Sequence, residues 1–328
     1  MTKGIGVAIV AVSLSASTVI HAFDLQGHRG ARGLMPENTL EGFETALSIG
    51  VTTLELDLAM TKDGVVVVSH DSLLNPDHTR GPDGKFLATQ GPAIRTLTLA
   101  ELKRYDVGAL KPGTPYAASF AGQRAVDGAR IPTLAEVFDL VRRVKADHVR
   151  FNIETKLTPT SGANTPDPDA FAGALAASVR EAGLAARVTL QSFDWRTLMV
   201  MRRIAPEIDR VCLTIDGGSG DTLRRGQPGA SPWTAGLDID AFDGSTPRLV
   251  SAAGCLVWSP NFRNVTAASL AEAGALRLPV IPWTVNERPD MARLIEMGVS
   301  GIITDYPDRL RAVMTDKKLP LPPAVPAR

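Results

Sequence analysis

The stretch Thr53–Asp71, TLELDLAMTKDGVVVVSHD, combines the pattern of a buried strand with charges that such a strand seldom carries. Side chains alternate between the two faces of a strand, so leucines at every second position predict one apolar face. Glu55 and Asp57 then lie together on the other face. Burying one carboxylate is costly, and two neighbouring carboxylates also repel each other. We therefore expect positive charge beside this pair.

The residues TKDG, at positions 61–64, predict a turn because Asp-Gly favours a hairpin. Residues 65–69 then return antiparallel to the strand and bring His70 about level with Asp57. The spacing predicts that His70 lies beside Glu55 and Asp57 in space.

Short apolar runs alternate with amphipathic helical patterns along the rest of the chain. The expected strands are 24–28, 53–58, 149–155, 187–191, 210–215, 255–258, 279–284 and 301–304. The expected helices are 39–49, 134–144, 169–182, 196–204, 267–276, 290–297 and 309–314, with a poorly defined one at 247–253. Eight strand–helix units predict an α/β fold, a closed (β/α)8 TIM barrel over residues 23–316.

Two long segments exceed a minimal barrel. Residues 72–131, which hold one helical pattern at 99–105, predict a small insertion after the second strand, and residues 216–247 predict a long loop. The first helix is expected to begin after Pro36 with Asn38 as its N-cap and Glu41 three residues later. The Pro-rich tail 317–328 is expected to be disordered.

Residues 1–22 have a basic start, an uncharged apolar run and a small residue at Ala22. This pattern predicts a cleaved secretory signal peptide and a periplasmic or secreted protein, with an uncleaved anchor as the alternative. After cleavage no stable membrane insertion is expected.

Cys212 and Cys255 lie in or beside apolar runs and are expected to be buried thiols, although export would permit a disulfide. No cysteine spacing suggests zinc.

The chain of 328 residues has 35 basic and 35 acidic residues, so its net charge is zero. A nucleic-acid or anionic-membrane surface needs a basic excess, and neither partner is expected. The oligomeric state is left open.

Polar residues cluster at the ends of the predicted strands, where barrel active sites are built. The residues are His28, Arg29, Glu55, Asp57, His70, Glu154, Lys156, Gln191, Trp283, Asn286 and Asp305. Three carboxylates suit a hard divalent cation, two basic side chains suit a phosphate, and two imidazoles suit proton transfer near neutral pH. The structural alternatives are a solvated strand edge, a turn histidine and a Glu–Lys ion pair. His21, His78 and His148 lack such neighbours; His21 is expected to leave with the signal peptide, and the other two to lie on surface loops.

Seven motifs in order, HRG, PENTLEGFETAL, ELDLAMTKDGVVVVSHD, NIETK, LQSFDW, PWTVN and GIITDYP, resemble the glycerophosphodiester phosphodiesterase family from about residue 25 to 310. The resemblance implies a phospholipase-C-like barrel that hydrolyses glycerophosphodiesters to sn-glycerol 3-phosphate and an alcohol. It implies that His28 and His70 are the acid/base pair, that Glu55, Asp57 and Glu154 bind the metal, and that Arg29 and Lys156 bind the phosphate. Glu37, Gln191 and Trp283 would contact the substrate or lie near the metal. The export signal and long insertion resemble the periplasmic branch, for which Ca²⁺ is expected over Mg²⁺.

Two other interpretations stay open at this point. A lysophospholipase D or sphingomyelinase-D-like enzyme would need an apolar groove, and neither 72–131 nor 216–247 shows an apolar face. A barrel that binds phosphodiesters without cleaving them would be expected to lack a histidine, and both are present. Attack by the neighbouring glycerol hydroxyl, which would give a cyclic phosphate, is also compatible with the residues.

Overall fold

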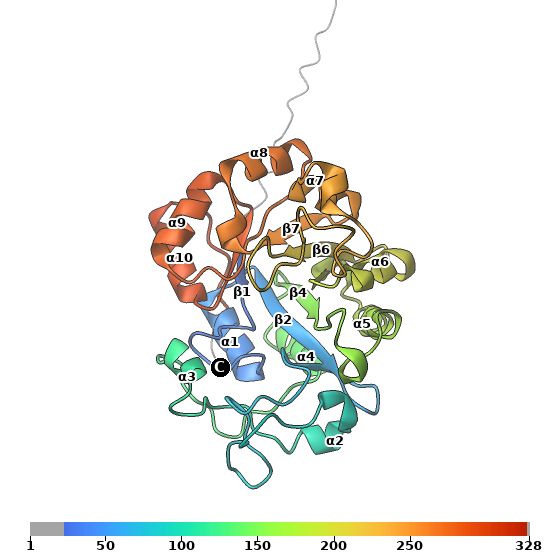
Figure 1. Cartoon of the computed structure of the whole chain (residues 1–328). Helices are drawn as coiled ribbons and strands as arrows, with labels where there is room; N and C mark the ends of the chain where they lie inside the picture. The colour runs from blue at the N-terminus through green and yellow to red at the C-terminus, as the bar shows by residue number, and fades with distance from the viewer. Residues whose placement is uncertain (1–22, 327–328) are drawn as a thin grey trace, which may run out of the picture.

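The structure, a computed structural model, describes residues 23–326 and forms a barrel of parallel strands surrounded by helices (Figure 1). The predicted signal peptide and His21 lie outside the described residues. The strands are β1 (Asp24–Gly27), β2 (Thr53–Met60), β3 (Val66–Val68), β4 (Arg150–Thr155), β5 (Val188–Ser192), β6 (Asp209–Thr214), β7 (Val257–Pro260) and β8 (Gly301–Thr304). They pair in the order β7-β6-β5-β4-β2-β1-β8, all parallel, and β3 pairs antiparallel with β2.

The expected strand at 279–284 closes the barrel between β7 and β8, but as an irregular extended segment. The Ile281 N–H donates to the Trp258 carbonyl, and the Ile303 N–H donates to the Pro282 carbonyl. Prolines at 279 and 282 have no N–H to donate, so a regular ladder cannot form there. The barrel prediction is confirmed, except that the expected seventh strand, 279–284, is irregular because of its prolines.

Ten α-helices occur among the described residues, and most surround the barrel (Figure 1). They are α1 (Leu40–Ile49), α2 (Leu99–Leu102), α3 (Pro115–Ser119), α4 (Leu134–Arg143), α5 (Pro168–Ala182), α6 (Trp195–Ile204), α7 (Thr246–Ala252), α8 (Ala267–Ala275), α9 (Arg288–Met297) and α10 (Pro307–Asp316). Each expected helix is present within a few residues. The short helix α3 was not expected from the sequence. None of the helices in residues 23–326 has the length and hydropathy needed to cross a bilayer.

The alternation in β2 places its side chains as predicted. Leu54, Leu56 and Leu58 are fully buried in the main core between the strands and helices. Glu55 and Asp57, which alternate with these leucines along the strand, are also buried. In the hairpin, the Ser69 N–H donates to the Asp57 carbonyl, which confirms the predicted register of β3.

Residues 72–131 lie beside the barrel with α2 and α3, next to α1 and α4 in the view of Figure 1. They share a small second core with the β2–β3 hairpin, and its buried members include Val67, Leu74, Ile94 and Leu102. The segment is therefore anchored to the strands that carry Asp57 and His70.

The predicted N-cap of α1 was wrong by one residue. Thr39 is the cap, and its hydroxyl accepts from the Gly42 N–H. Asn38 instead adopts a left-handed backbone with φ of 54°, a conformation that asparagine tolerates better than most residues. That turn directs the Asn38 side chain to Asp57, and its amide donates to Asp57 Oδ2 at 3.0 Å.

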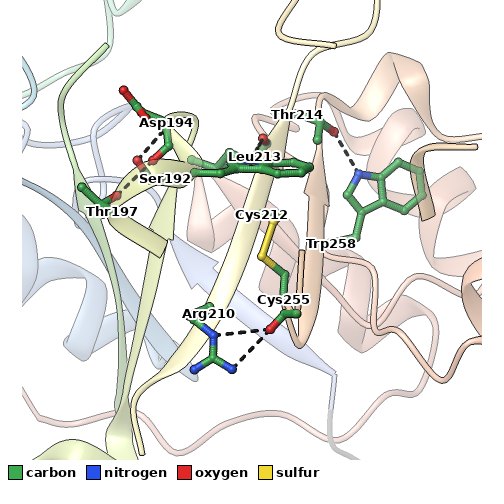
Figure 2. The surroundings of a disulfide bond; sticks show 11 residues. Ser192, Asp194, Thr197, Arg210, Cys212, Leu213, Thr214, Cys255 and Trp258 are labelled. Carbon is green, nitrogen blue, oxygen red and sulfur yellow. Dashed lines mark hydrogen bonds between the residues drawn. A yellow bond between two sulfur atoms is a disulfide. The ribbon is translucent and has the colours of Figure 1, made fainter. Parts of the chain in front are cut away.

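The expectation of two buried thiols was also wrong, because Cys212 and Cys255 form a disulfide (Figure 2). Cys212 lies on β6 and Cys255 lies just before β7, so the bond joins two neighbouring strands of the barrel. The Arg210 guanidinium donates to the Gly254 carbonyl beside it. Both cysteines are buried as predicted, but the apolar pattern of each run gave no information on their pairing.

The tail also differs from its prediction of disorder. Over residues 317–326 it packs back on the barrel. The Val325 N–H donates to the Leu47 carbonyl, and Arg311 donates to the Pro322 carbonyl. Leu319 and Val325 pack against the main core. Proline-rich composition excludes helix and sheet here, but it does not exclude an extended segment held by its carbonyls.

Candidate active site

Three carboxylates meet at the carboxyl ends of two adjacent strands. Asp57 of β2 and Glu154 of β4 are register partners. Glu55 lies two residues before Asp57, on the same face of β2. One oxygen from each of the three carboxylates lies within 4.8 Å of the others, and all three residues are buried. The predicted ligand set is therefore brought together.

Hydrogen bonds fix the orientation of these carboxylates. Glu55 accepts from the Arg29 backbone N–H at 2.8 Å and from the Gln191 side-chain amide at 2.7 Å. Glu154 accepts from Lys156 Nζ at 2.9 Å. Gln191 thus acts behind Glu55, on β5, as well as lining the cavity.

The carboxylates differ in how well their charges are compensated. Burial, followed by the charge of Asp57, raises the pKa of Glu55 well above its usual range. Burial also raises the pKa of Glu154 to about 7, despite Lys156. Burial would raise the pKa of Asp57 as well, but the charges of Arg29, His70, Lys156 and His28 together outweigh it and hold that pKa below its usual range. Glu55 and Glu154 therefore lack enough neighbouring positive charge in the protein to offset the burial of their own charges.

The cluster fits a divalent cation on these observations. Its donors are all carboxylate oxygens, which hard cations such as Ca²⁺ and Mg²⁺ prefer. The uncompensated charge of Glu55 and Glu154 gives a physical reason for a cation to bind there. The buried Glu55–Asp57–Glu154 cluster is a divalent metal site in chemical type, and the identity of the ion is considered below.

His28 follows β1, and its imidazole is held by Asp305, a residue predicted at the end of the last strand without a role. Its Nδ1 lies 2.6 Å from Asp305 Oδ1, and its Nε2 lies 3.9 Å from Glu55 Oε2. Asp305 also accepts two hydrogen bonds from Arg32 and one from Asn286. Burial, followed by the charge of Arg32, lowers the pKa of His28 to about 4.

His70 follows β3 and has a similar partner. Its Nδ1 lies 2.8 Å from Asp71 Oδ1, and the side chain is partly exposed to the cavity. Asp71 also accepts from the Asn75 side-chain amide at 2.7 Å. Burial, followed by the charge of Arg29, lowers the pKa of His70. Both predicted imidazoles thus engage a carboxylate through Nδ1, which leaves Nε2 for the reaction.

The two predicted basic side chains lie beside the carboxylates. Arg29 Nη1 donates to Glu37 at 2.7 Å, and Arg29 Nε lies 3.2 Å from Asp57 Oδ2. Lys156 Nζ lies 3.8 Å from Asp57 Oδ1 in addition to its bond with Glu154. Burial would raise the pKa of Glu37, but the charges of Arg29, His78, Arg32 and His70 together outweigh it and lower that pKa to about 2.

A cavity of about 490 Å³ lies elsewhere, between β6, β7, α7 and α8, but the predicted residues line a different one of about 300 Å³. Its charged and polar side includes both histidines, Arg29, Glu55, Glu154 and Lys156. Trp283 and Phe193 form its aromatic side, with ring centroids 5.2 Å apart, edge to face. Trp283 therefore lines the cavity. Neither Glu37 nor Asp57 lines the cavity, and both contact Arg29, which does.

The structure corrects the interpretation of His78 as a surface loop residue. Its side chain is only 14% exposed, and Nε2 lies 3.7 Å from Asp71 Oδ2. His148 is exposed, as expected. Asp71, Asn38 and Arg32 were not predicted from the sequence to support the site, and no role was predicted for Asp305. The motif TDYP could have signalled Asp305, because it ends the last strand beside His28.

Comparison with known proteins agrees with this geometry. The family model described as the glycerophosphoryl diester phosphodiesterase family matches residues 28–309. The chain belongs to this family. It is accordingly an enzyme of the glycerophosphodiester phosphodiesterase class.

A glycerophosphodiester phosphodiesterase from Caldanaerobacter subterraneus is 29% identical over 283 residues, which cover 86% of this chain and 94% of the relative. A crystal structure from Silicibacter pomeroyi DSS-3, assigned to the glycerophosphoryl diester phosphodiesterases, has a TM-score of 0.80 and 36% identity over 92% of this chain and 95% of that one. An Oleispira antarctica phosphodiesterase in complex with sn-glycerol 3-phosphate has a TM-score of 0.63 and 19% identity, over 90% of this chain and 97% of that one, and shares the fold.

Proposed function

We propose that the protein hydrolyses glycerophosphodiesters to sn-glycerol 3-phosphate and an alcohol, with a bound divalent cation and two histidines as acid and base. The observation that supports it most is the content of one cavity. Two carboxylate-held imidazoles, two basic side chains, Glu55 and Glu154 line a cavity of about 300 Å³, a volume suited to a small ligand. Asp57 completes the carboxylate cluster of Glu55 and Glu154.

Arg29 and Lys156 would bind the phosphate. Both side chains line the cavity. A guanidinium and an ammonium there supply the fixed positive charge and the N–H donors that a phosphate prefers. Trp283 and Phe193 would face the carbon skeleton of the glycerol, since their rings form the apolar side of the cavity.

His28 and His70 would transfer the protons. With Nδ1–H donated to Asp305 or Asp71, each neutral ring presents a free Nε2. One imidazole takes the proton of the attacking oxygen as the new P–O bond forms. The other, as imidazolium, gives its proton to the leaving alcohol oxygen as the old P–O bond breaks. The attacking oxygen is water or the neighbouring glycerol hydroxyl, which would give a cyclic phosphate before hydrolysis.

Glu55, Asp57 and Glu154 would hold the cation, which supplies positive charge for the phosphate oxygens. We propose Ca²⁺ rather than Mg²⁺. Calcium accepts six to eight oxygen ligands and tolerates several carboxylates, whereas magnesium usually keeps its waters and takes one or two. Three carboxylates on adjacent strands suit the larger ion better.

Export to the periplasm or the exterior is part of the same proposal. Residues 1–22 have the pattern of a signal peptide. The Cys212–Cys255 disulfide supports an oxidising compartment, since such bonds seldom persist in a reducing cytosol.

The test uses the purified chain from Phe23 onward, with glycerophosphocholine as substrate. Release of sn-glycerol 3-phosphate is measured enzymatically, with and without EDTA, and lysophosphatidylcholine is assayed in parallel. We expect release from glycerophosphocholine that EDTA abolishes. Preferred cleavage of lysophosphatidylcholine would favour lysophospholipase D activity, and no cleavage of either would favour a binding protein. His148→Ala, at an exposed histidine, is the matched control for variants of His28 and His70.

A further inference from the structure

Three groups of the candidate site depend on a carboxylate that lies behind them. The pairs are His28 with Asp305, Arg29 with Glu37 and His70 with Asp71. The first partner of each pair lines the cavity, and none of the three carboxylates does. Each of these three cavity side chains is therefore held by a carboxylate that does not line the cavity.

The insertion 72–131 touches the surroundings of all three carboxylates. The Tyr116 hydroxyl donates to Glu37 Oε2. His78 Nε2 lies 3.7 Å from Asp71 Oδ2. The Phe120 ring stacks on the Arg32 guanidinium at 4.7 Å, and that guanidinium donates two hydrogen bonds to Asp305. Gln123 adds a hydrogen bond to the Arg32 carbonyl.

The three insertion rings, those of His78, Tyr116 and Phe120, also pack on one another. The Tyr116 ring lies 5.9 Å from the His78 ring and 5.3 Å from the Phe120 ring. Aromatic pairs at such separations contribute about 0.5–1.5 kcal/mol beyond their buried area. Tyr116 is the central member, so His78, Tyr116 and Phe120 form one unit, here named the aromatic cluster.

We propose that the aromatic cluster is a positioning element, through which the insertion orients Arg29, His70 and His28 by way of Glu37, Asp71 and Arg32–Asp305. This inference rests on the proposed function of the cavity. The insertion would then have a specific role, because its contacts set the direction of a phosphate-binding guanidinium and two imidazoles without contacting the substrate.

The arms of the cluster should affect different kinetic constants. Tyr116 acts on Arg29, which binds phosphate, so loss of the hydroxyl should raise KM. His78 acts on His70, which moves a proton, so loss of the imidazole should lower kcat. Partners behind a functional group typically change affinity or activity about 10- to 100-fold. A merely structural role would instead lower the melting temperature and reduce apparent kcat through loss of folded protein, while KM and the affinity for product stay unchanged.

The experiment compares Tyr116→Phe, which keeps the ring, with His78→Gln. The matched control is Phe86→Leu, at another insertion aromatic that stacks on Arg80 instead of on a site residue. Steady-state constants for glycerophosphocholine, thermal melting, and calorimetric affinity for sn-glycerol 3-phosphate are measured for each. We expect Tyr116→Phe to raise KM and weaken product binding about 10-fold, and His78→Gln to lower kcat about 10-fold, with melting temperatures unchanged.

Constants within twofold of wild type for both variants would overturn the inference, as would equal effects in Phe86→Leu. If His78→Gln does not fold, the KM effect of Tyr116→Phe decides alone. An inactive wild type would refute the proposed function, while the affinity of Tyr116→Phe for sn-glycerol 3-phosphate would still test the arm through Glu37 and Arg29.

Discussion

Replacing both cysteines of the Cys212–Cys255 bond with alanine should lower the melting temperature by about 6 °C. The bond joins residues 43 apart in sequence. Chain entropy assigns a loop of this length about 4 kcal/mol of stability, because the crosslink restricts the unfolded state. Average unfolding entropies for a domain of about 300 residues convert each kcal/mol into about 1.5 °C. Alanine is preferred to serine because both positions are buried.

Scanning calorimetry of the wild type, the double variant and the wild type with a phosphine reductant measures this shift. The reduced wild type and the variant should melt at nearly the same temperature. Leu213, next to Cys212, lines the cavity, but the strand remains paired on both sides, so turnover at 25 °C should be retained. A melting temperature that changes by less than 2 °C in both samples, or free thiols in protein purified from the periplasm, would refute the reasoning.

Three further predictions concern the cavity and the carboxylates behind it. His70→Ala should lower kcat at least about 100-fold, as expected for a positioned acid or base, and stopped assays that find a tenth of wild-type turnover would contradict its role. Asp305→Asn should lower kcat about 10³-fold with little change in KM, because the neutral amide no longer fixes the tautomer of His28; circular dichroism checks the fold, and unchanged kinetics would exclude this role. Because the folded pKa of Glu37 is about 2, below its ordinary value of 4.5, the carboxylate stabilises the fold above about pH 4.5, and that stability is lost as pH falls towards 2. The free energy of unfolding, measured with urea across pH 3–7, should therefore fall less in acid for Glu37→Gln than for wild type. Parallel pH curves for the two proteins would contradict this prediction.

The barrel and the carboxylate cluster could be predicted because they depend on local alternation. In β2 the leucines and acids must face opposite sides, and once the strand is parallel to β4, Asp57 and Glu154 have to meet. The hairpin turn at 61–64 fixes His70 in the same way. These relations need only the periodicity of a strand and the topology of a barrel.

The partners behind the site could not be predicted in this way. Asn38 reaches Asp57 because its backbone is left-handed, and the helix-cap pattern assigned it to α1 instead. His78 and Tyr116 come from the insertion, whose loops have no period that would place them. The pairing of Cys212 with Cys255 and the packing of the tail likewise depend on contacts between segments that are distant in sequence.

The central claim is that a cation held by Glu55, Asp57 and Glu154 is required for diester cleavage in this cavity. The most direct test strips the purified protein with EDTA and titrates it with Ca²⁺ in a calorimeter, while release of sn-glycerol 3-phosphate is assayed at each addition. We predict one ion per chain, turnover that rises with occupancy, and weaker binding for Glu154→Gln. Full turnover by metal-free protein, or equal Ca²⁺ affinity in Glu154→Gln, would contradict the claim.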